Sequence, residues 1–215
     1  MEDKILISLN KLSKNKVFPN GSKRKIFSDL SLSLSFSNYD NICLNEEIME
    51  IDELLKIISG IEKADSGEIV IKINEEKVIG KFPYIPNESS LPEWLTVIEN
   101  ISLPFKFQDI PYSESEKRIN EAIEICGLDG YEHHISLSGS IGFNFRVELC
   151  RAIALEPKLI ILQNPFSRFK EKDKADFSEL IKNIFEKKGI HFLFTASKTD
   201  FEKIGNNRVL FIESI

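Results

Sequence analysis

The strongest constraint on the fold is an alternation of short, wholly apolar runs with longer segments of helical periodicity. Leu159–Leu162 consists of four consecutive apolar residues, a pattern typical of a parallel strand that is buried on both faces. The segments 143–155 and 177–188, on either side of it, carry apolar residues at helical spacing. Strands that alternate with helices predict an α/β fold with a mostly parallel central sheet and helices on both faces.

The first third of the chain predicts an additional antiparallel unit. Leu and Ser alternate strictly over 30–36, and a period of two with one apolar face is typical of a half-buried antiparallel strand. Residues 5–9 form another strand-like run. The stretch 14–24 is rich in Lys, Asn, Pro and Gly, so we expect a turn there.

The remaining expected elements complete the alternation. Ser113 and Glu116 match a capping box at the start of an expected helix over 113–126. Gly60 is a good stop signal for an expected helix over 53–60. Further strands are expected at 41–44, 68–73, 82–85, 191–195 and 208–212, and a short helix at 200–205.

Composition excludes several classes of protein. The 215 residues are 42% hydrophobic and 29% charged, which suits one soluble domain with a sizeable core and excludes a disordered or collagen-like chain. The formal net charge of −6 offers no positive field for a nucleic acid, so none is expected as a partner. The sequence has no apolar run long enough to span a membrane and no signal-like N-terminus, so we expect neither insertion nor export.

The cysteines and histidines do not predict a metal site. Cys43, Cys126 and Cys150 lie far apart in the sequence and are expected to be buried thiols of a protein in a reducing compartment. His133 and His134 are neighbours on an expected loop, and no third ligand is spaced to join them. We therefore expect no metal.

Three ordered segments, 54–69, 92–101 and 151–167, carry a resemblance to a known family. In order and spacing they resemble the nucleotide-binding domain of an ATP-binding cassette (ABC) transporter, and the resemblance covers nearly all of the chain. It implies a P-loop NTPase-like fold with an N-terminal antiparallel β subdomain and a helical subdomain. The implied single domain covers 1–215, with the β subdomain and core over 1–87, the helical subdomain over about 88–150 and the core again over 151–215.

The family's phosphate loop, G-x-x-x-x-G-K-[ST], holds phosphates and Mg²⁺ through its backbone amides, lysine and hydroxyl. The resemblance places Asn45 and Glu50 at the two glycines, Ile51 at the lysine and Asp52 at the hydroxyl. Counting Glu53 and the two glutamates inside the loop, five carboxylates occupy the region of the triphosphate. We therefore expect ATP binding to be lost and the helix N-terminus to be capped by the loop's own carboxylates, best by Asp52.

The family's other nucleotide contacts are replaced as well. The Mg²⁺-binding aspartate and the catalytic glutamate correspond to Gln163 and Asn164, which keep the shape of those side chains without their charge. The glutamine that senses the γ-phosphate corresponds to Asn87, and the switch histidine corresponds to Ala196. Lys170 stands where an aspartate is expected. The resemblance thus implies no catalytic residue and no cofactor in the chain's own site.

The family's signature, L-S-G-G-Q, contacts nucleotide that the partner in a dimer holds. Counted back from Arg151, the signature falls on 139–143, which keeps Ser140 and Gly142. A rival register places it at 137–140. In either register a serine lies near a helix N-terminus, so a phosphate contact in trans stays open beside the alternative of a plain serine N-cap.

Aromatic residues mark a candidate docking surface. Trp94, Phe105 and Phe107 lie in the segment that, by resemblance, borders the groove for a permease's coupling helix. Exposed aromatic side chains suit a protein anchor site, and core packing is the alternative for each of them. The basic residues between Lys14 and Lys25 are expected to form a solvated turn.

The resemblance with these replacements implies a catalytically inactive cassette subunit of a membrane ABC transporter. We expect it to form a heterodimer with an active ATPase subunit, which holds ATP and Mg²⁺ at a shared interface, and to dock on a permease at the cytoplasmic face of the membrane. Two alternatives stay open. The chain is an active ATPase with unconventional site residues, or it is a structural or regulatory adaptor without a transport cycle.

Overall fold

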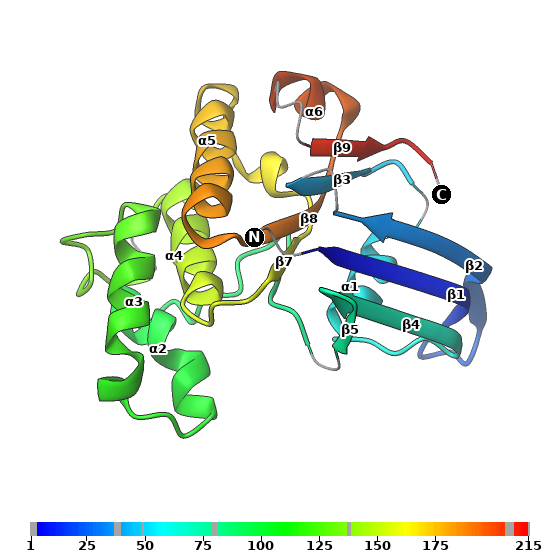
Figure 1. Ribbon diagram of the computed structural model, residues 1–215, viewed down its shortest axis with the longest axis horizontal. Helices are drawn as coiled ribbons and strands as arrows, with labels where there is room; N and C mark the ends of the chain where they lie inside the picture. Colours follow the sequence, from blue (N-terminus) through cyan, green and yellow to red (C-terminus); the bar gives the residue numbers. More distant parts are fainter. Residues whose placement is uncertain are drawn as a thin grey trace. The chain divides into compact units, whose positions relative to one another are not determined.

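The computed structural model describes most of the chain and divides it into two compact units. The first unit is Met1–Phe82 with His191–Ile215, and the second is Pro83–Ile190 (Figure 1). The described residues are 4–36, 40–48, 50–78, 81–136, 139–204 and 209–214. The subdomain boundaries expected after residues 87 and 150 stay a prediction.

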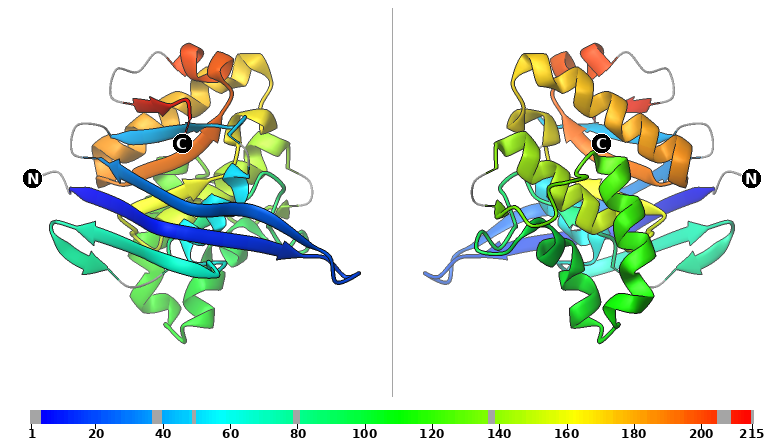
Figure 2. Two further views of the ribbon diagram at one scale, coloured as in Figure 1. Left: turned by 90° about the vertical axis from the view of Figure 1, so that its right-hand side faces the viewer. Right: turned by 90° about the vertical axis from the view of Figure 1, so that its left-hand side faces the viewer.

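The first unit contains the expected antiparallel layer. Its strands are β1 (Ile5–Val17), β2 (Lys23–Ser35), β4 (Ser66–Ile73) and β5 (Glu76–Val78), in the order β2-β1-β4-β5 (Figure 2). Alternate residues of β1, beginning with Ile5 and Ile7, are buried, as the pleat of a strand with one core face requires. The turn expected over 14–24 is wrong in extent, because both strands extend into it.

The ladder between β1 and β2 is interrupted by bulges. Register shifts lie between Leu9 and Asn15. Lys11 and Asp29 have positive φ angles of 48° and 53°, a backbone conformation often associated with bulges. Two serine hydroxyls of the facing strands accept their backbone N–H groups, Ser31 Oγ from Lys11 at 3.0 Å and Ser13 Oγ from Asp29 at 3.1 Å. The irregular positions are therefore hydrogen-bonded across the hairpin.

The parallel strands of the first unit are β3 (Asn41–Asn45), β8 (His191–Ala196) and β9 (Val209–Ile212), with β3 between the other two. All residues of β3 and β8 are buried. The helices of this unit are α1 (Ile51–Ser59) and α6 (Lys198–Ile204). α1 begins two residues before its expected start and ends at Gly60, whose φ of 81° suits glycine.

In its described residues, the second unit combines two parallel strands with four α-helices and a 3-10 helix. β6 (Tyr84–Ile85) pairs with β7 (Leu159–Leu162), which is buried throughout as its four apolar residues predict. The other elements are α2 (Val97–Phe107), α3 (Tyr112–Cys126), α4 (Ile141–Ile153), the 3-10 helix η2 (Pro165–Arg168) and α5 (Glu171–Lys188). α2, α3 and α4 pack against one another. Phe145, Phe166 and Phe169 surround Phe177 of α5, with ring centroids 4.9–5.0 Å from it.

Helix α2 was not among the expected elements. Pro104 lies inside it and makes the sequence resemble a loop, since proline removes a helical hydrogen bond. The helix is instead defined at its start, where Thr96 and Glu99 form a complete capping box. The capping box expected at Ser113 and Glu116 is wrong, because α3 begins after Pro111 without a side-chain cap.

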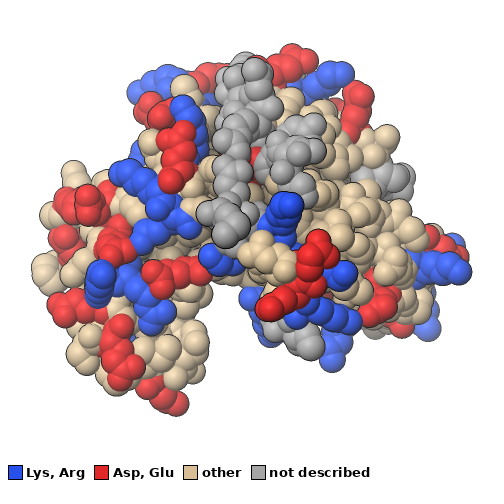
Figure 3. All heavy atoms as spheres, viewed as in Figure 1, with Lys and Arg blue, Asp and Glu red and all other residues tan. Residues whose placement is uncertain are grey.

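Charged side chains of both signs share the surface. On the face drawn in Figure 3, basic and acidic side chains are interspersed. Within the described ranges, no helix combines the length and the apolar character that crossing a membrane requires.

Candidate functional site

The loop between β3 and α1 is the segment that the resemblance aligns with the phosphate loop, and several of its backbone amides bond within the first unit. Asn45 accepts twice, through its side-chain oxygen from the Glu47 N–H and through its carbonyl from the Ile48 N–H, both at 3.1 Å. The Glu46 N–H donates to the carbonyl of Ala196 at 3.0 Å. The amides of Glu46, Glu47 and Ile48 are thus paired with protein oxygens.

Glu50 adopts a conformation that glycine prefers. It precedes α1 with φ 60° and ψ 25°, in the left-handed region, where a non-glycine residue is uncommon. The resemblance puts the second loop glycine at this position. Glu50 makes no side-chain cap to α1 and instead forms an ion pair with Arg24 of β2. The expected cap by Asp52 is wrong, because Asp52 lies inside the helix, after Glu50 and Ile51.

Ile51 and Glu53 are both buried, but they differ in polarity. Ile51, at the lysine position, is only 4% exposed. The carboxylate of Glu53 lies 2.9 Å from Lys16 Nζ and 3.6 Å from Lys56 Nζ. Burial alone would raise the pKa of Glu53, but the hydrogen bond from Lys16 and the charge of Lys56 outweigh it and lower the pKa. Glu53 is therefore a charged, paired side chain.

The basic residues of the hairpin lie on strands β1 and β2 and not on a turn, which corrects the expectation, although all but Lys14 are exposed as expected. Lys14 Nζ lies 3.3 Å from a carboxylate oxygen of Glu62, while Lys16 and Arg24 pair with the carboxylates at the start of α1. Sequence reasoning missed these pairs because β1 and α1 are far apart in the chain. The sequence did contain a signal for these pairs, since a basic segment in the hairpin and an acidic segment around α1 carry opposite charges.

In the second unit, the amide positions form an uncharged hydrogen-bonded network. Gln163 Oε1 accepts from Tyr84 Oη at 2.7 Å and from the Asn87 N–H at 3.4 Å. Ser167 Oγ lies 2.6 Å from Asn87 Oδ1 and 2.8 Å from the carbonyl oxygen of Asn164. The structure therefore brings Asn87, Gln163 and Asn164 together, and it adds Tyr84 and Ser167, which sequence reasoning did not assign to the site.

Three of the replaced positions lie at the ends of helices or strands. Asn164 precedes η2 in the left-handed region, with φ 39° and ψ 56°, which asparagine tolerates better than most residues. Lys170 is exposed and precedes α5 as its N-cap residue, without a side-chain cap. Ala196 belongs to the first unit, where it ends β8 fully buried.

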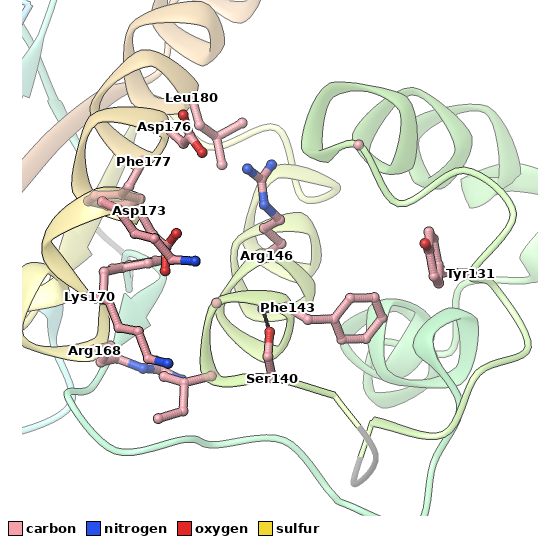
Figure 4. A pocket seen from close by; sticks show the side chains of 15 residues that line it. Tyr131, Ser140, Phe143, Arg146, Arg168, Lys170, Asp173, Asp176, Phe177 and Leu180 are labelled. Carbon is pink, nitrogen blue, oxygen red and sulfur yellow. Dashed lines mark hydrogen bonds between the residues drawn. The ribbon is translucent and has the colours of Figure 1, made fainter.

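The segment 139–143, which the resemblance aligns with the signature, leads into α4. Ser140 is the N-cap, and its Oγ accepts the Phe143 N–H at 3.2 Å (Figure 4). The serine N-cap is therefore present, and the phosphate contact in trans stays a prediction. Ser140 and Gly142 border a cavity of about 680 Å³ that Phe177 of α5 also lines. The residues 137–138 of the rival register lie outside the described residues.

A buried charge cluster in the second unit was also missed. Glu148 of α4 is 1% exposed and pairs with Arg168, and its carboxylate also accepts from Ser89 Oγ at 3.1 Å. Arg151 Nη2 donates to Ser90 Oγ at 2.7 Å. The sequence signal for this buried charge was Glu148 itself, which stands alone within the apolar run from Val147 to Cys150.

The aromatic residues of the candidate docking surface differ in their exposure to solvent. Trp94 is 76% exposed and Phe107 is 83% exposed, whereas Phe105 is 1% exposed. The guanidinium of Arg118 lies 5.0 Å from the Phe105 ring centroid. Phe105 is therefore a core residue, and the expectation that it is an exposed anchor is wrong.

The three cysteines are free and buried, as expected. Burial raises the pKa of the Cys43 thiol and that of Cys150, which keeps both protonated and unreactive. The His134 ring packs on Tyr131, with ring centroids 5.0 Å apart. Among the described residues, no three histidine, cysteine, aspartate or glutamate side chains gather as metal ligands would.

Comparison with models of protein families gives a match for this chain. The model of the family described as ABC transporter matches residues 53–167, more than half of the sequence. The chain belongs to the ABC transporter family. The match to this family begins directly after the loop at 45–52.

Curated ABC relatives align with part of their length. The aliphatic sulfonates import ATP-binding protein SsuB of Bacillus anthracis is 30% identical over 162 residues, 75% of this chain and 63% of that protein. The sulfate/thiosulfate import ATP-binding protein CysA of Nocardia farcinica is 29% identical over 140 residues, 62% of this chain and 41% of that protein. The chain thus spans less than two thirds of the length of both relatives.

Solved ABC structures match the fold over nearly the whole chain. The dimeric structure of MJ0796, described as a bacterial ABC transporter cassette, has a TM-score of 0.75 at 19% identity and covers 97% of this chain and 96% of that one. cbiO1 from Clostridium perfringens, part of the ABC transporter complex cbiONQ, has a TM-score of 0.75 at 16% identity, covering 96% and 84%. The expected ABC cassette fold, with a parallel sheet and an antiparallel β subdomain, is confirmed.

Proposed function

We propose that this chain is a catalytically inactive cassette subunit of a membrane ABC transporter complex. One observation carries the proposal: described amides and carboxylates of the loop that the resemblance aligns with the phosphate loop already have partners within the chain. Its amides bond to Asn45 and Ala196, and the carboxylates of Glu50 and Glu53 pair with cations of the same unit. A triphosphate would meet these carboxylates and a buried Ile51 in place of a lysine, which does not fit Mg-ATP.

The second unit supports the same proposal. The positions of the Mg²⁺-binding aspartate and the catalytic glutamate carry the amides of Gln163 and Asn164. Amides supply no negative charge to a metal ion and accept no proton from an attacking water at neutral pH. Gln163 Oε1 already accepts from Tyr84. The chain therefore offers no group for phosphoryl transfer at these positions.

We further propose an active ATPase subunit and a permease as partners. The relatives SsuB and CysA are import ATP-binding proteins by name, and MJ0796 was solved as a dimer. In an asymmetric dimer the active subunit holds ATP and Mg²⁺ in its own loop, and Ser140 and Gly142 of this chain face that nucleotide from the N-terminus of α4. This places the chain at the cytoplasmic face of the membrane, held there by the complex.

Titration of the isolated chain with Mg-ATP tests the loss of nucleotide binding. We expect no heat of binding in isothermal titration calorimetry up to millimolar nucleotide, because the carboxylates of the loop repel the phosphates. The matched control is an active cassette titrated under the same conditions. A micromolar Kd for this chain would refute the proposal.

The two alternatives make different predictions about substitutions. If the acidic loop held Mg²⁺ in an active enzyme, the purified chain would hydrolyse ATP and Asp52→Ala would abolish that turnover. If the chain were an adaptor without a transport cycle, the double substitution Ile51→Lys with Asn164→Glu would leave the function of the complex unchanged. We expect no turnover in the first experiment and altered transport in the second.

Removing the exposed indole should weaken permease binding. Trp94→Ala is expected to reduce co-purification of the permease from native membranes about tenfold or more, since exposed tryptophans are frequent anchors of interfaces. Because Trp94 is 76% exposed, the circular dichroism and melting temperature should stay unchanged. Tyr112→Ala, at a side chain that is 46% exposed, is the matched control. Unchanged permease yield with Trp94→Ala would contradict this docking surface.

A further inference from the structure

We infer that Glu50 and Glu53 are a built-in anionic ligand for the cation pair Lys16 and Arg24, and that these contacts lock α1 to the β1–β2 hairpin. The inference rests on the proposed function only in describing these carboxylates as a replacement for bound phosphate; the contacts between α1 and the hairpin do not depend on it. All four residues belong to the first unit. The Lys16–Glu53 and Arg24–Glu50 pairs together form an ionic lock.

The hairpin places two like charges side by side. Lys16 of β1 and Arg24 of β2 are direct cross-strand partners in the antiparallel register. Like charges directly opposite each other on a sheet are destabilising. The pair of strands therefore needs anions at this position.

The start of helix α1 supplies the anions. Glu50 precedes the helix as its N-cap residue, in the left-handed region, and Glu53 lies in the first turn. Lys16 Nζ is 2.9 Å from Glu53 Oε1, and Arg24 pairs with Glu50. Two neighbouring carboxylates thus meet two neighbouring cations.

The carboxylates are more buried than the cations, so they depend more on the ion pairs. The side chains of Glu53 and Glu50 are 9% and 17% exposed, whereas those of Lys16 and Arg24 are 53% and 59% exposed. A carboxylate with little access to water needs a partner that replaces its hydration. The cations are therefore the counter-charges of two carboxylates that have little access to water.

Further contacts extend the lock along the same strand. Lys14 Nζ donates to the carbonyl of Lys63 at 2.7 Å and pairs with Glu62. Asp65 accepts the backbone N–H of Asn15 at 2.8 Å and its side-chain amide at 2.9 Å. Three consecutive residues of β1, beginning at Lys14, thus bond to α1 or to the segment that follows it. The ionic lock is one part of a continuous set of contacts and not an isolated surface pair, which is why we assign it a structural role.

Charge exchange tests the lock. Glu50→Arg alone is expected to lower the denaturant midpoint of unfolding, because it puts a third cation beside Lys16 and Arg24. Arg24→Glu alone should lower it less, because its contact with Glu50 becomes repulsive while its cross-strand contact with Lys16 becomes attractive. The double variant Arg24→Glu with Glu50→Arg should recover most of that loss. Glu68→Gln, which removes the exposed pair between Glu68 and Lys77, is the control and should leave the midpoint unchanged. A double variant no more stable than the worse single variant would overturn the lock.

Anion binding gives a second readout that does not depend on the reversed charges. In the variant Glu50→Gln with Glu53→Gln the cations lose their internal ligand, so inorganic triphosphate without Mg²⁺ should bind about tenfold more tightly than to the unchanged chain. Equal affinity for the two proteins would overturn the inference. If the unchanged chain binds Mg-ATP while charge exchange still restores stability, the proposed function fails and the lock stands; if exchange fails and Mg-ATP does not bind, the lock alone fails.

Discussion

Replacing Glu148 with alanine is expected to lower the free energy of unfolding by about 3–5 kcal/mol, because it leaves the buried guanidinium of Arg168 without its counter-charge. The side chains of Glu148 and Arg168 are 0% and 6% exposed. The same carboxylate also accepts from the backbone N–H of Ser90, so the loss includes hydrogen bonds as well as charge. Thermal unfolding followed by circular dichroism should show a fall of about 10 °C in the midpoint.

Two further variants separate charge from shape. Glu148→Gln keeps the side-chain volume and one acceptor, so its midpoint should lie between those of the alanine variant and the unchanged chain. Glu148→Met with Arg168→Met removes both charges, and such replacements of buried pairs are often close to neutral. A midpoint unchanged by Glu148→Ala would show that Arg168 finds another partner.

Gly67→Ala is expected to be the most damaging change in the antiparallel layer, with a loss of about 3 kcal/mol or more. Gly67 has φ +92°, and a Cβ there would lie 2.4 Å from the carbonyl oxygen of Lys11 and 2.7 Å from that of Asn10. Both atoms belong to the backbone of β1, so no side-chain rotation relieves the contact. The measurement is the free energy of unfolding from a urea titration.

Gly21→Ala separates this steric contact from backbone strain. Gly21 has a similar φ of +79°, and a Cβ there would meet nothing within 4 Å. Its cost should be that of the left-handed conformation alone, about 1–2 kcal/mol. Equal losses for the two variants would contradict the steric explanation for Gly67.

The fold could be predicted well where burial alone determines an element. The four apolar residues of β7 and the alternating Leu and Ser of β2 indicated buried and half-buried strands, which the structure contains. Local sequence patterns predicted an element less well where its start is set by hydrogen bonds of the capping residues. Pro104 hid α2, whose start depends on the reciprocal bonds of Thr96 and Glu99. The hairpin was underestimated because its polar end is ordered by contacts with α1 and not by apolar periodicity.

The candidate site was predictable as a set of positions but not as a set of contacts. The spacing of motifs assigned Asn45, Gln163 and Asn164 their places in the chain. It gave no indication that Tyr84 donates to Gln163 or that Arg24 pairs with Glu50, since such partners are chosen by tertiary packing over 26 to 79 residues of sequence. Phe105 illustrates the same limit of sequence-based prediction, because an aromatic residue fits either the core or an exposed anchor site until its neighbours are known.

The bulged ladder of β1 and β2 has a consequence for folding fidelity. In a strand of repeating Leu-Ser pairs, slippage by two residues would present an almost identical apolar face, so burial alone distinguishes the alternatives poorly. The serines repeat with the leucines, so the Lys11–Ser31 bond could form after such a slip as well, but Asp29 holds a left-handed conformation with φ 53°. A slip by two would bring Phe27 or Ser31 to that position, and aspartate tolerates it better than either. The left-handed bulge at Asp29 thus favours one pairing within a repetitive sequence, which lowers the chance of mispaired, aggregation-prone hairpins.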